Sequence, residues 1–538
     1  MSTNDIQPRS LAEQLHNSLI TSCHDYAINI YHSGDIISAS GAELDKNARK
    51  LAAAFTQAQI SQTPVLVLLD SGYDFIQVLA AAIYSGITIA PCPVPKKTQD
   101  FQRLRSIVND TRFSAAIVHE RDRQHIKQCL PGVNVFTIEA LMGEALALNA
   151  VSKFLPPRDN VAIIQYSSGS TARPKGVLLS GQMILANFLT VANDWQFNTQ
   201  HRHLTWLPHY HDMGLFGGLL YPILSGGWLM VLDPNTFIKR PAVWLKLISQ
   251  YRVNVSGGPP FAYEICLRYL SEKLTAQLDL SCWSLAFCGA DYIPATLKKQ
   301  VAHGLVDTGF SADAFFACYG LAETVLFAGG VKCRGGKIND ELMHLHSHST
   351  LPCYLGAKHT NIDIFSLQDN QPLAPGQEGE ICLSGPAIAL LYSSGEVPSF
   401  EYAHRRWIRT GDIGIISGDL LSITGRIKDI IKLRGKTLYP IDFAVLANKL
   451  YPQLNPHVFL LQTTESAEIL SFSIETYTHQ HSQWHVETSQ ALQLAFNEAF
   501  GIFVRDVIIC KRNTMDRTTS GKVQRWKAKV SKEQNATH

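Results

Sequence analysis

Residues 166–176 read YSSGSTARPKG, in which small hydroxylated residues and glycines accompany a single lysine. The stretch follows VAIIQY (161–166), an apolar run of the kind that forms a buried strand. Hydroxyl groups can donate hydrogen bonds, glycine lets backbone N–H groups approach an anion, and lysine supplies positive charge. It is not a Walker loop, because proline precedes the lysine and glycine follows it. The stretch is therefore either an ordinary polar loop or a polyphosphate-binding loop formed by Ser167, Ser168, Gly169, Ser170, Thr171 and Lys175.

On both sides of this loop, short β-rich runs alternate with helix-like stretches. PVLVLLD (64–70) precedes an apolar helix candidate that begins near Phe75, and QMILANFLTVANDW (182–195) follows the loop. SLAFCGA (284–290) and FFACYG (315–320) are again typical of buried strands that end in glycine turns. This alternation predicts parallel sheets covered by helices, with ligands at the carboxyl ends of the strands.

Further along the chain the pattern changes to closely spaced strands joined by turn residues. EGEICLSG (378–385) is followed by RWIRTGDIGII (406–416) and LLSITGR (420–426), and Ser417-Gly418-Asp419 separates the last two. This spacing predicts an antiparallel, barrel-like subdomain over approximately residues 350–425.

We therefore predict an α/β fold with more than one domain, because 538 residues are too many for one ordinary core. The large N-terminal domain, residues 1–425, would comprise two αβ-layered subdomains together with the barrel-like subdomain. Residues 426–538 would form a small, mobile α+β C-terminal domain, since about 110 residues with their own strand–helix alternation can build a separate core.

Composition excludes several classes of protein. Lys and Arg number 47 against 45 Asp and Glu, and no basic block is present, so a nucleic-acid partner is not expected. The 11 cysteines include no CxxC pair, which argues against a zinc site or a disulfide framework and favours the cytoplasm. The apolar segment 215–232 is interrupted by glycines and Pro222, so it is predicted to be a core segment and the chain not to be an integral membrane protein.

Five separated motifs give a more specific indication. Besides the opening loop they are WLPHYHDMG (206–214), YGLAET (319–324), RTGD (409–412) with GRIKDIIKLRG (425–435), and TTSGKVQR (518–525). In this order and spacing they resemble the adenylate-forming superfamily over nearly the whole chain. WLPHYHDMGL, FIKRPAVWLKLISQYR and SGGPPFAYEICLR are most similar to the fatty acyl-AMP ligases within it.

The resemblance implies a reaction. A fatty acid of medium or long chain would be activated with ATP and Mg²⁺ to acyl-AMP with release of pyrophosphate, and the acyl group would pass to the phosphopantetheine thiol of an acyl carrier protein. A fatty acyl-CoA synthetase of the same fold is the alternative, and a non-catalytic acyl- or nucleotide-binding relative is a second one. A segment within residues 325–355 resembles the insertion associated in the ligases with poor use of CoA.

The resemblance also assigns roles to residues that would otherwise be ordinary turn or surface positions. The loop would hold the departing phosphates, and Glu323 would bind Mg²⁺. Tyr319 would lie against the adenine, and Gly320 would also bind ATP. Gly289-Ala290-Asp291 would form the turn on the adenine side, where relatives often have Glu in place of Asp. Ala172 likewise stands where the superfamily loop usually has glycine.

The remaining roles concern the ribose, the carboxylate and the small domain. Asp412 would accept hydrogen bonds from the ribose hydroxyls, and Arg426 would contact the ribose or a phosphate. His211 would lie at the rim of the acyl pocket near the carboxylate. Lys522 would bridge the carboxylate and the α-phosphate, and Lys428 would be the hinge about which the small domain rotates.

Overall fold

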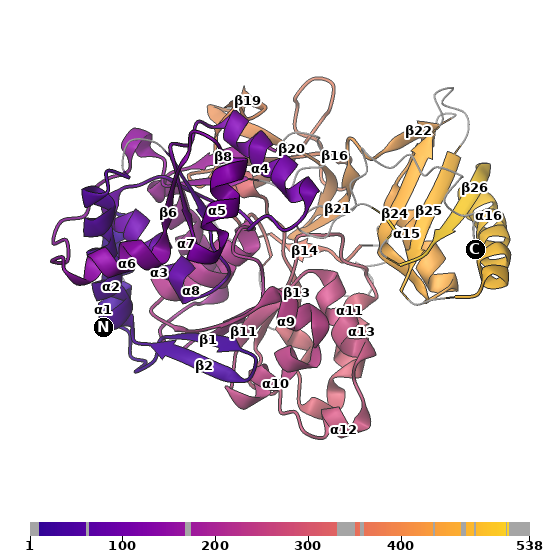
Figure 1. The fold of residues 1–538 in the computed structure, drawn as a ribbon. Helices are drawn as coiled ribbons and strands as arrows, with labels where there is room; N and C mark the ends of the chain where they lie inside the picture. The colour runs from indigo at the N-terminus through magenta and orange to yellow at the C-terminus, as the bar shows by residue number, and fades with distance from the viewer. Residues whose placement is uncertain are drawn as a thin grey trace.

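The computed structural model describes residues 10–60, 64–166, 174–330, 350–355, 360–433, 436–463, 470–477, 480–512 and 514–515. The polyphosphate-loop residues 167–173, most of the 325–355 segment and Lys522 lie outside the described residues. Figure 1 shows the helices and sheets of the N-terminal part gathered into one large body and the C-terminal residues in a smaller one beside it.

The opening loop connects two strands of a mainly parallel sheet, here called the β3 sheet. Its strand order is β18-β17-β8-β7-β4-β3-β5-β6, and β3 to β7 run parallel where they pair with one another. The strands β3, β5 and β7 are buried along their whole length, which suits the apolar sequences of β3 and β5, while β7 also buries Gln165. The strands are β3 (Val65–Leu68), β4 (Ile89–Pro91), β5 (Ala115–Val118), β6 (Asn134–Thr137), β7 (Ile163–Tyr166), β8 (Gly176–Leu179), β17 (Leu391–Tyr392) and β18 (Gly395–Glu396).

A neighbouring sheet, the β10 sheet, has the order β13-β12-β11-β9-β10-β1-β2. All its pairings are parallel except that of β1 with β2, which confirms the prediction from strand–helix alternation. The strands are β1 (Ile28–His32), β2 (Asp35–Ala39), β9 (Arg202–Thr205), β10 (Trp228–Leu232), β11 (Val255–Gly258), β12 (Leu285–Cys288) and β13 (Phe315–Ala317).

Helices cover these sheets, and several begin at a residue whose side chain caps the first turn. Ser40, Thr137 and Ser180, for example, each accept a hydrogen bond from a backbone N–H of the helix that follows. The helices are α1 (Leu11–Ile20), α2 (Gly41–Gln57), α3 (Tyr73–Ser85), α4 (Thr98–Asp110), α5 (Glu120–Cys129), α6 (Ile138–Leu146), α7 (Gly181–Trp195), α8 (Tyr221–Leu224), α9 (Pro234–Lys239), α10 (Ala242–Gln250), α11 (Pro260–Arg268), α12 (Glu272–Thr275) and α13 (Leu297–Gly304).

The apolar segment 215–232 is a core segment, as predicted. It contains most of the π-helix η2 (Met213–Leu220), then α8 and β10, and nearly all its residues are buried. Among the helices of the described ranges, none combines the length and the apolar character needed to cross a bilayer.

The antiparallel subdomain follows the order β14-β21-β20-β16-β15, with β19 paired to β20. Gly418 adopts φ 57° in the turn between β20 and β21, where a glycine is the favoured residue. This confirms the predicted hairpins, but residues 391–396 leave the subdomain and join the edge of the β3 sheet through Tyr392 and Val177. The strands are β14 (Cys353–Tyr354), β15 (Asn361–Phe365), β16 (Glu378–Ser384), β19 (Ser399–Tyr402), β20 (Arg405–Ser417) and β21 (Leu420–Arg426).

The C-terminal residues form a small α+β domain with a core of its own. Phe443, Phe472 and Phe496 are fully buried in that core, with ring centroids 5.0–6.0 Å apart. The predicted boundary after residue 425 falls at the end of β21, and its position remains a prediction. The elements are β22 (Ile431–Leu433), β23 (Lys436–Leu438), α15 (Pro440–Leu450), β24 (Leu454–Thr463), β25 (Leu470–Thr476), α16 (Ser482–Phe500) and β26 (Val504–Cys510).

Candidate functional site

One cavity of about 370 Å³ brings together segments that are far apart in the sequence. Its walls come from the end of β7, from η2, from the carboxyl ends of β12 and β13, and from β17, β20 and β21. Parallel strands end at this edge, which is the position expected for a ligand. The predicted site residues that line the cavity are Lys175, His211, Ala290, Asp291, Tyr319, Gly320, Glu323, Asp412, Arg426 and Lys428.

The opening loop itself is not described, but both of its flanks reach the cavity. Tyr166 at the end of β7 and Lys175 just before β8 line the wall. Ser167, Ser168, Gly169, Ser170, Thr171 and Lys522 lie outside the described residues, so their predicted roles remain predictions.

Asp412 is held rigidly at one side of the cavity by two donors. Arg426 Nε lies 2.8 Å from Asp412 Oδ1, and the Tyr319 hydroxyl donates to Asp412 Oδ2 at 2.8 Å. The carboxylate is only 5% exposed, and its negative charge raises the pKa of Arg426. Burial, followed by the same charge, raises the pKa of Tyr319, so its phenol stays protonated. An ionised carboxylate has about four acceptor positions, so capacity for hydroxyl donors remains.

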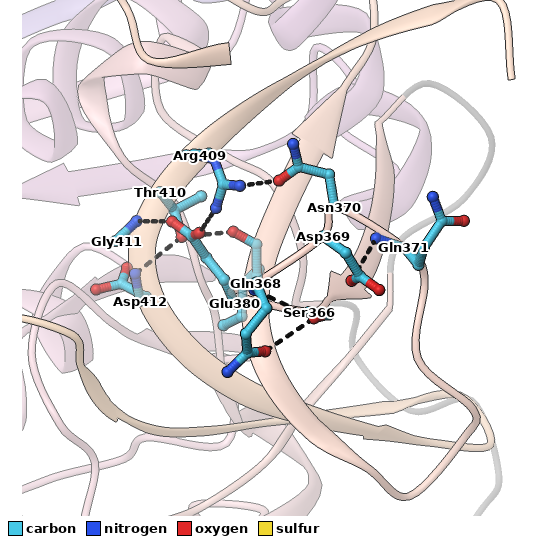
Figure 2. A network of polar contacts seen from close by, with 11 residues as sticks. Ser366, Gln368, Asp369, Asn370, Gln371, Glu380, Arg409, Thr410, Gly411 and Asp412 are labelled. Carbon is cyan, nitrogen blue, oxygen red and sulfur yellow. Dashed lines mark hydrogen bonds and ion pairs between the residues drawn. The ribbon is translucent and has the colours of Figure 1, made fainter. Parts of the chain in front are cut away.

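A second network lies behind Asp412 and fixes the backbone of the RTGD motif (Figure 2). Glu380 Oε1 accepts a hydrogen bond from the N–H of Gly411 at 3.1 Å, and Glu380 also pairs with Arg409. The N–H of Asp412 donates to Thr410 Oγ1 at 3.0 Å. Gly411 adopts φ 73°, a conformation that glycine accepts without strain. Sequence reasoning missed Glu380, whose one local signal is an acid directly before the apolar run Ile381-Cys382-Leu383.

Glu323 lies on the short 3₁₀ helix η5 (Ala322–Thr324) and accepts a hydrogen bond at Oε1 from the Tyr392 hydroxyl at 2.7 Å. Burial raises the pKa of Glu323, the hydrogen bond from Tyr392 opposes that rise, and Asp212 adds to it. Tyr392 belongs to β17, and Lys175 Nζ lies 4.9 Å from the centroid of its ring. No sequence motif pointed to Tyr392.

These surroundings suit a hard divalent cation. A buried carboxylate whose pKa is raised by burial and by a second acid gains most from a nearby positive charge. Within the described residues no three His, Cys, Asp or Glu side chains are grouped to hold a metal ion. Mg²⁺ typically binds through one or two carboxylates and completes its shell with water and phosphate oxygens. Glu323 is therefore adequate as its protein ligand in this cavity.

The residue after η5 has an unusual backbone. Val325 adopts φ 67° and ψ −58°, and the N–H of Leu326 donates to the carbonyl of Thr324 at 2.8 Å, which closes a γ-turn. A positive φ is strained for a β-branched residue. Gly320 lies against this turn, since a Cβ at Gly320 would be 1.7 Å from the carbonyl oxygen of Leu326. Strain of this kind is concentrated at functional sites, and here it lies two residues after Glu323.

The two histidines of the WLPHYHDMG motif lie in different surroundings. His211 lines the cavity, and its Nδ1 is 2.6 Å from Asp212 Oδ1. His209 is buried against Phe75, with its Nδ1 2.7 Å from Ser71 Oγ, and burial lowers its pKa to about 3. His209 is therefore a neutral core residue. An apolar wall of the same cavity is formed by Val191, Trp195, Phe197, Met213, Tyr221 and Phe287.

The turn Gly289-Ala290-Asp291 follows β12, and Tyr319-Gly320 follows the adjacent strand β13. Ala290 has φ 67°, and Asp291 Oδ1 accepts the N–H of Tyr292 at 2.9 Å. Lys428 lies beyond β21 in a turn closed by the N–H of Asp429 and the carbonyl of Arg426 at 2.9 Å. All three segments meet the cavity, although Gly289 itself is not among its lining residues.

Comparison with known proteins identifies the family. The chain belongs to the AMP-binding enzymes, whose family model matches residues 21–393. It is similar to JamA of Moorena producens, a medium-chain-fatty-acid–[acyl-carrier-protein] ligase, with 29% identity over 543 residues that cover 92% of this chain and 90% of the relative.

Other relatives agree in fold and length. TtuA of Teredinibacter turnerae is also named a medium-chain-fatty-acid–[acyl-carrier-protein] ligase. It is 26% identical to this chain, and the match covers 90% of this chain and 87% of TtuA. A solved structure from work on fatty acyl-adenylate ligases of E. coli and L. pneumophila aligns with a TM-score of 0.83 at 25% identity, covering 96% of each chain. The fold is therefore that of adenylate-forming enzymes.

Proposed function

We propose that the protein is a fatty acyl-AMP ligase that activates a medium- or long-chain fatty acid with ATP and passes the acyl group to an acyl carrier protein. One observation carries this proposal: residues of separated motifs line a single cavity that has a charged side and an apolar side. The names of the relatives JamA and TtuA favour the same reaction and a medium chain.

The charged side would hold the nucleotide. Asp412, fixed by Tyr319 and Arg426, would accept hydrogen bonds from the ribose hydroxyls. The 167–173 loop and Lys175 would hold the outer phosphates. Mg²⁺, held by Glu323, would neutralise phosphate charge when bound. The apolar wall would hold the alkyl chain and leave its carboxylate near His211.

The reaction then needs mainly positioning and charge neutralisation. A carboxylate oxygen of the fatty acid attacks the α-phosphorus, and the bond from that phosphorus to the oxygen bridging the β-phosphorus breaks, releasing pyrophosphate. Lys522 would approach with the small domain to stabilise the charge that develops. The carrier thiolate afterwards attacks the acyl carbon, and AMP leaves with the electron pair of its phosphate–acyl bond.

The acceptor distinguishes this proposal from the second candidate, a fatty acyl-CoA synthetase. Both would use the same adenylation residues, so the cavity alone favours neither. The relatives named as carrier-protein ligases, and the predicted insertion within 325–355, favour the carrier protein. We place the reaction in the cytoplasm, where the thiols of the described cysteines, all unpaired, would stay reduced.

Product analysis with a fatty-acid panel, ATP, Mg²⁺ and either CoA or a holo-carrier protein tests the proposal. We expect fatty-acid-dependent ATP–pyrophosphate exchange and acylation of the carrier, with little acyl-CoA. Lys522→Ala should abolish exchange and leave ATP binding largely intact, which separates catalysis from binding. No exchange by the unmodified protein would favour the non-catalytic alternative, and preferred acylation of CoA would favour the synthetase.

A further inference from the structure

A cluster of polar side chains joins the two domains at the side of the cavity. Glu264 lies on α11 of the large domain, and its Oε1 is 2.9 Å from Nε2 of His457 on β24 of the small domain. The hydroxyl of Tyr477, just after β25, donates to Oε2 of Glu264 at 2.8 Å. The guanidinium carbon of Arg268 lies 3.4 Å from the centroid of the Tyr477 ring. We call these four residues the Glu264 cluster, and Figure 1 shows α11 on the side of the large domain that faces the small one.

The cluster is shielded from water and reaches the functional site. The side chains of Glu264 and His457 are 12% and 9% exposed, and His457 also lines the cavity. Hydrogen bonds between ionised partners are stronger than neutral ones, and a buried charge that loses its partner is costly. The pair therefore favours the arrangement in which α11 and β24 are in contact.

Protonation controls this attraction. Burial alone would raise the pKa of Glu264, but the charge of His457 and hydrogen bonds from His457 and Tyr477 outweigh it and lower that pKa. Burial alone would lower the pKa of His457, but the charge of Glu264, the hydrogen bond with Glu264 and the charge of Asp291 together outweigh burial and raise that pKa. The other groups that face the pair are Asp291, which favours the charged histidine, Arg268, which opposes it, and the neutral Cys288 thiol.

The signs define a pH window. Because the pKa of His457 is raised, the stabilisation that the charged His457 gives to the docked arrangement is complete below the ordinary histidine pKa. This stabilisation is lost as the pH rises through the raised pKa. Because the pKa of Glu264 is lowered, the stabilisation that the ionised Glu264 gives to the docked arrangement is complete above the ordinary carboxyl pKa. This stabilisation is lost as the pH falls through the lowered pKa. The attraction is therefore complete on the mildly acidic side of neutrality and weakens toward alkaline pH.

We propose that Glu264 and His457 are positioning residues, whose ion pair docks the small domain beside the cavity and whose loss frees that domain to rotate. For its catalytic consequence the inference rests on the proposed function, in which Lys428 is the hinge and the small domain serves adenylation and thiol transfer in different arrangements. Docking itself does not depend on that function.

The test compares Glu264→Gln and His457→Gln with the unmodified protein. Hydrogen–deuterium exchange should show protection factors about tenfold lower in peptides covering residues 260–268 and 454–463, because a charge-assisted hydrogen bond is lost. In the unmodified protein this protection should fall as the pH rises above neutral, and in His457→Gln it should not depend on pH. Glu272→Gln, at an exposed acid on the neighbouring helix α12, is the matched control.

The half-reactions provide the functional readout. The ratio of ATP–pyrophosphate exchange to transfer from acyl-AMP to the carrier should change about tenfold in both variants, one rate rising as the other falls. Protection factors equal to those of Glu272→Gln, or an equal fall in both half-reactions, would overturn the positioning role. If the unmodified protein shows no exchange, the proposed function fails, and the protection factors still decide docking.

Discussion

At the scale of single residues, Val325 shows how the backbone around Glu323 is fixed. Its side chain is fully buried, and its positive φ places a β-branched residue where glycine would be unstrained. The local sequence YGLAETV does not predict this conformation. It is imposed by contacts with the distant chain, such as the N–H of Ala389, which donates to the carbonyl of Glu323 at 2.7 Å.

We expect Val325→Gly to be more stable than Val325→Ala by about 1 kcal/mol, because glycine relieves the strain that alanine retains. At an unstrained position the order is reversed by about 0.5–1 kcal/mol. Thermal unfolding of the large domain measures the difference. Both variants lose the branched part of the valine side chain, and they differ from each other by one methyl group. Alanine equal to or above glycine would show that the turn stores no strain.

Tyr392 favours the ionised form of Glu323 by donating a hydrogen bond to it, against the effect of burial. Its replacement by phenylalanine keeps the ring under Lys175 and removes the hydrogen bond that opposes the raised pKa of Glu323. A carboxyl group with a raised pKa stabilises the folded protein as the neutral acid, and this stabilisation is lost as the pH rises through that pKa. Cation binding, in contrast, needs the ionised carboxylate.

We therefore expect Tyr392→Phe to need several-fold more Mg²⁺ for half-maximal pyrophosphate exchange. The difference should be larger near about pH 6 than near about pH 8, because protons compete more at low pH. Glu323→Gln, which cannot titrate, serves as control and should show a weak Mg²⁺ response without the pH dependence. A Mg²⁺ requirement unchanged in Tyr392→Phe at both pH values would separate this hydrogen bond from cation binding.

At the scale of elements, the hairpin of β20 and β21 carries Asp412 and Arg426, and β16 supports it through Glu380. Glu380 is 2% exposed, and it holds both Arg409 and the N–H of Gly411. The sequence predicted the strands and the site motif on them. It could not predict their support, because Glu380 and Gly411 are 31 residues apart and no local pattern joins them.

Glu380→Gln should raise the KM for ATP several-fold and leave the KM for the fatty acid nearly unchanged, because the network lies behind Asp412, the proposed ribose-binding residue. Stability should fall by about 2 kcal/mol as Arg409 loses its ionised partner. Steady-state kinetics and thermal unfolding measure the two effects. Asp369→Asn, an exposed acid drawn in the same network in Figure 2, is the control and should change neither. Equal changes in both KM values would point to general loss of structure instead.

The segment within 325–355 is an element whose role the sequence suggests through resemblance alone. Its residues 331–349 lie outside the described ranges, and on either side Phe327 and Leu351 line the cavity. Replacing 331–349 with a short glycine-serine linker should increase CoA use at least about tenfold if the segment restricts the acceptor. Acyl-CoA formation and carrier acylation are measured side by side, and unchanged CoA use in a folded variant that still acylates the carrier would contradict the restriction.

At the scale of the whole molecule, the described residues of the large and small domains form separate cores, and unfolding should reflect this. We expect calorimetry to show two transitions. Phe443→Ala, in the small core, should reduce the free energy of unfolding of the small domain by about 3–5 kcal/mol. One transition should therefore move to a lower temperature, and the temperature of the other should not change. Phe237→Ala, in the large core, is the reciprocal variant. A single transition lowered equally by both would show that the domains unfold together.

Within the described residues, the motifs predicted segments that line one cavity, since each motif carries its own residue pattern. They did not predict Tyr392, Glu380 or the Glu264 cluster, because such pairs are set by tertiary packing. Glu323 and Tyr392 are 69 residues apart, and Glu264 and His457 are 193 residues apart. Hydrophobic periodicity reports which face of an element is buried, and it carries no information about which polar group lies opposite.

The β17–β18 hairpin has a consequence for how this chain can be divided. It lies within the antiparallel segment, yet it covers the edge strand β8, and the N–H of Ser393 donates to the carbonyl of Gly176 at 2.7 Å. A fragment that stopped before residue 391 would leave β8 as an open edge, which invites aggregation. Chimeras that exchange the large domain between related enzymes should therefore be joined near residue 426, the predicted domain boundary, and not at the start of the antiparallel subdomain.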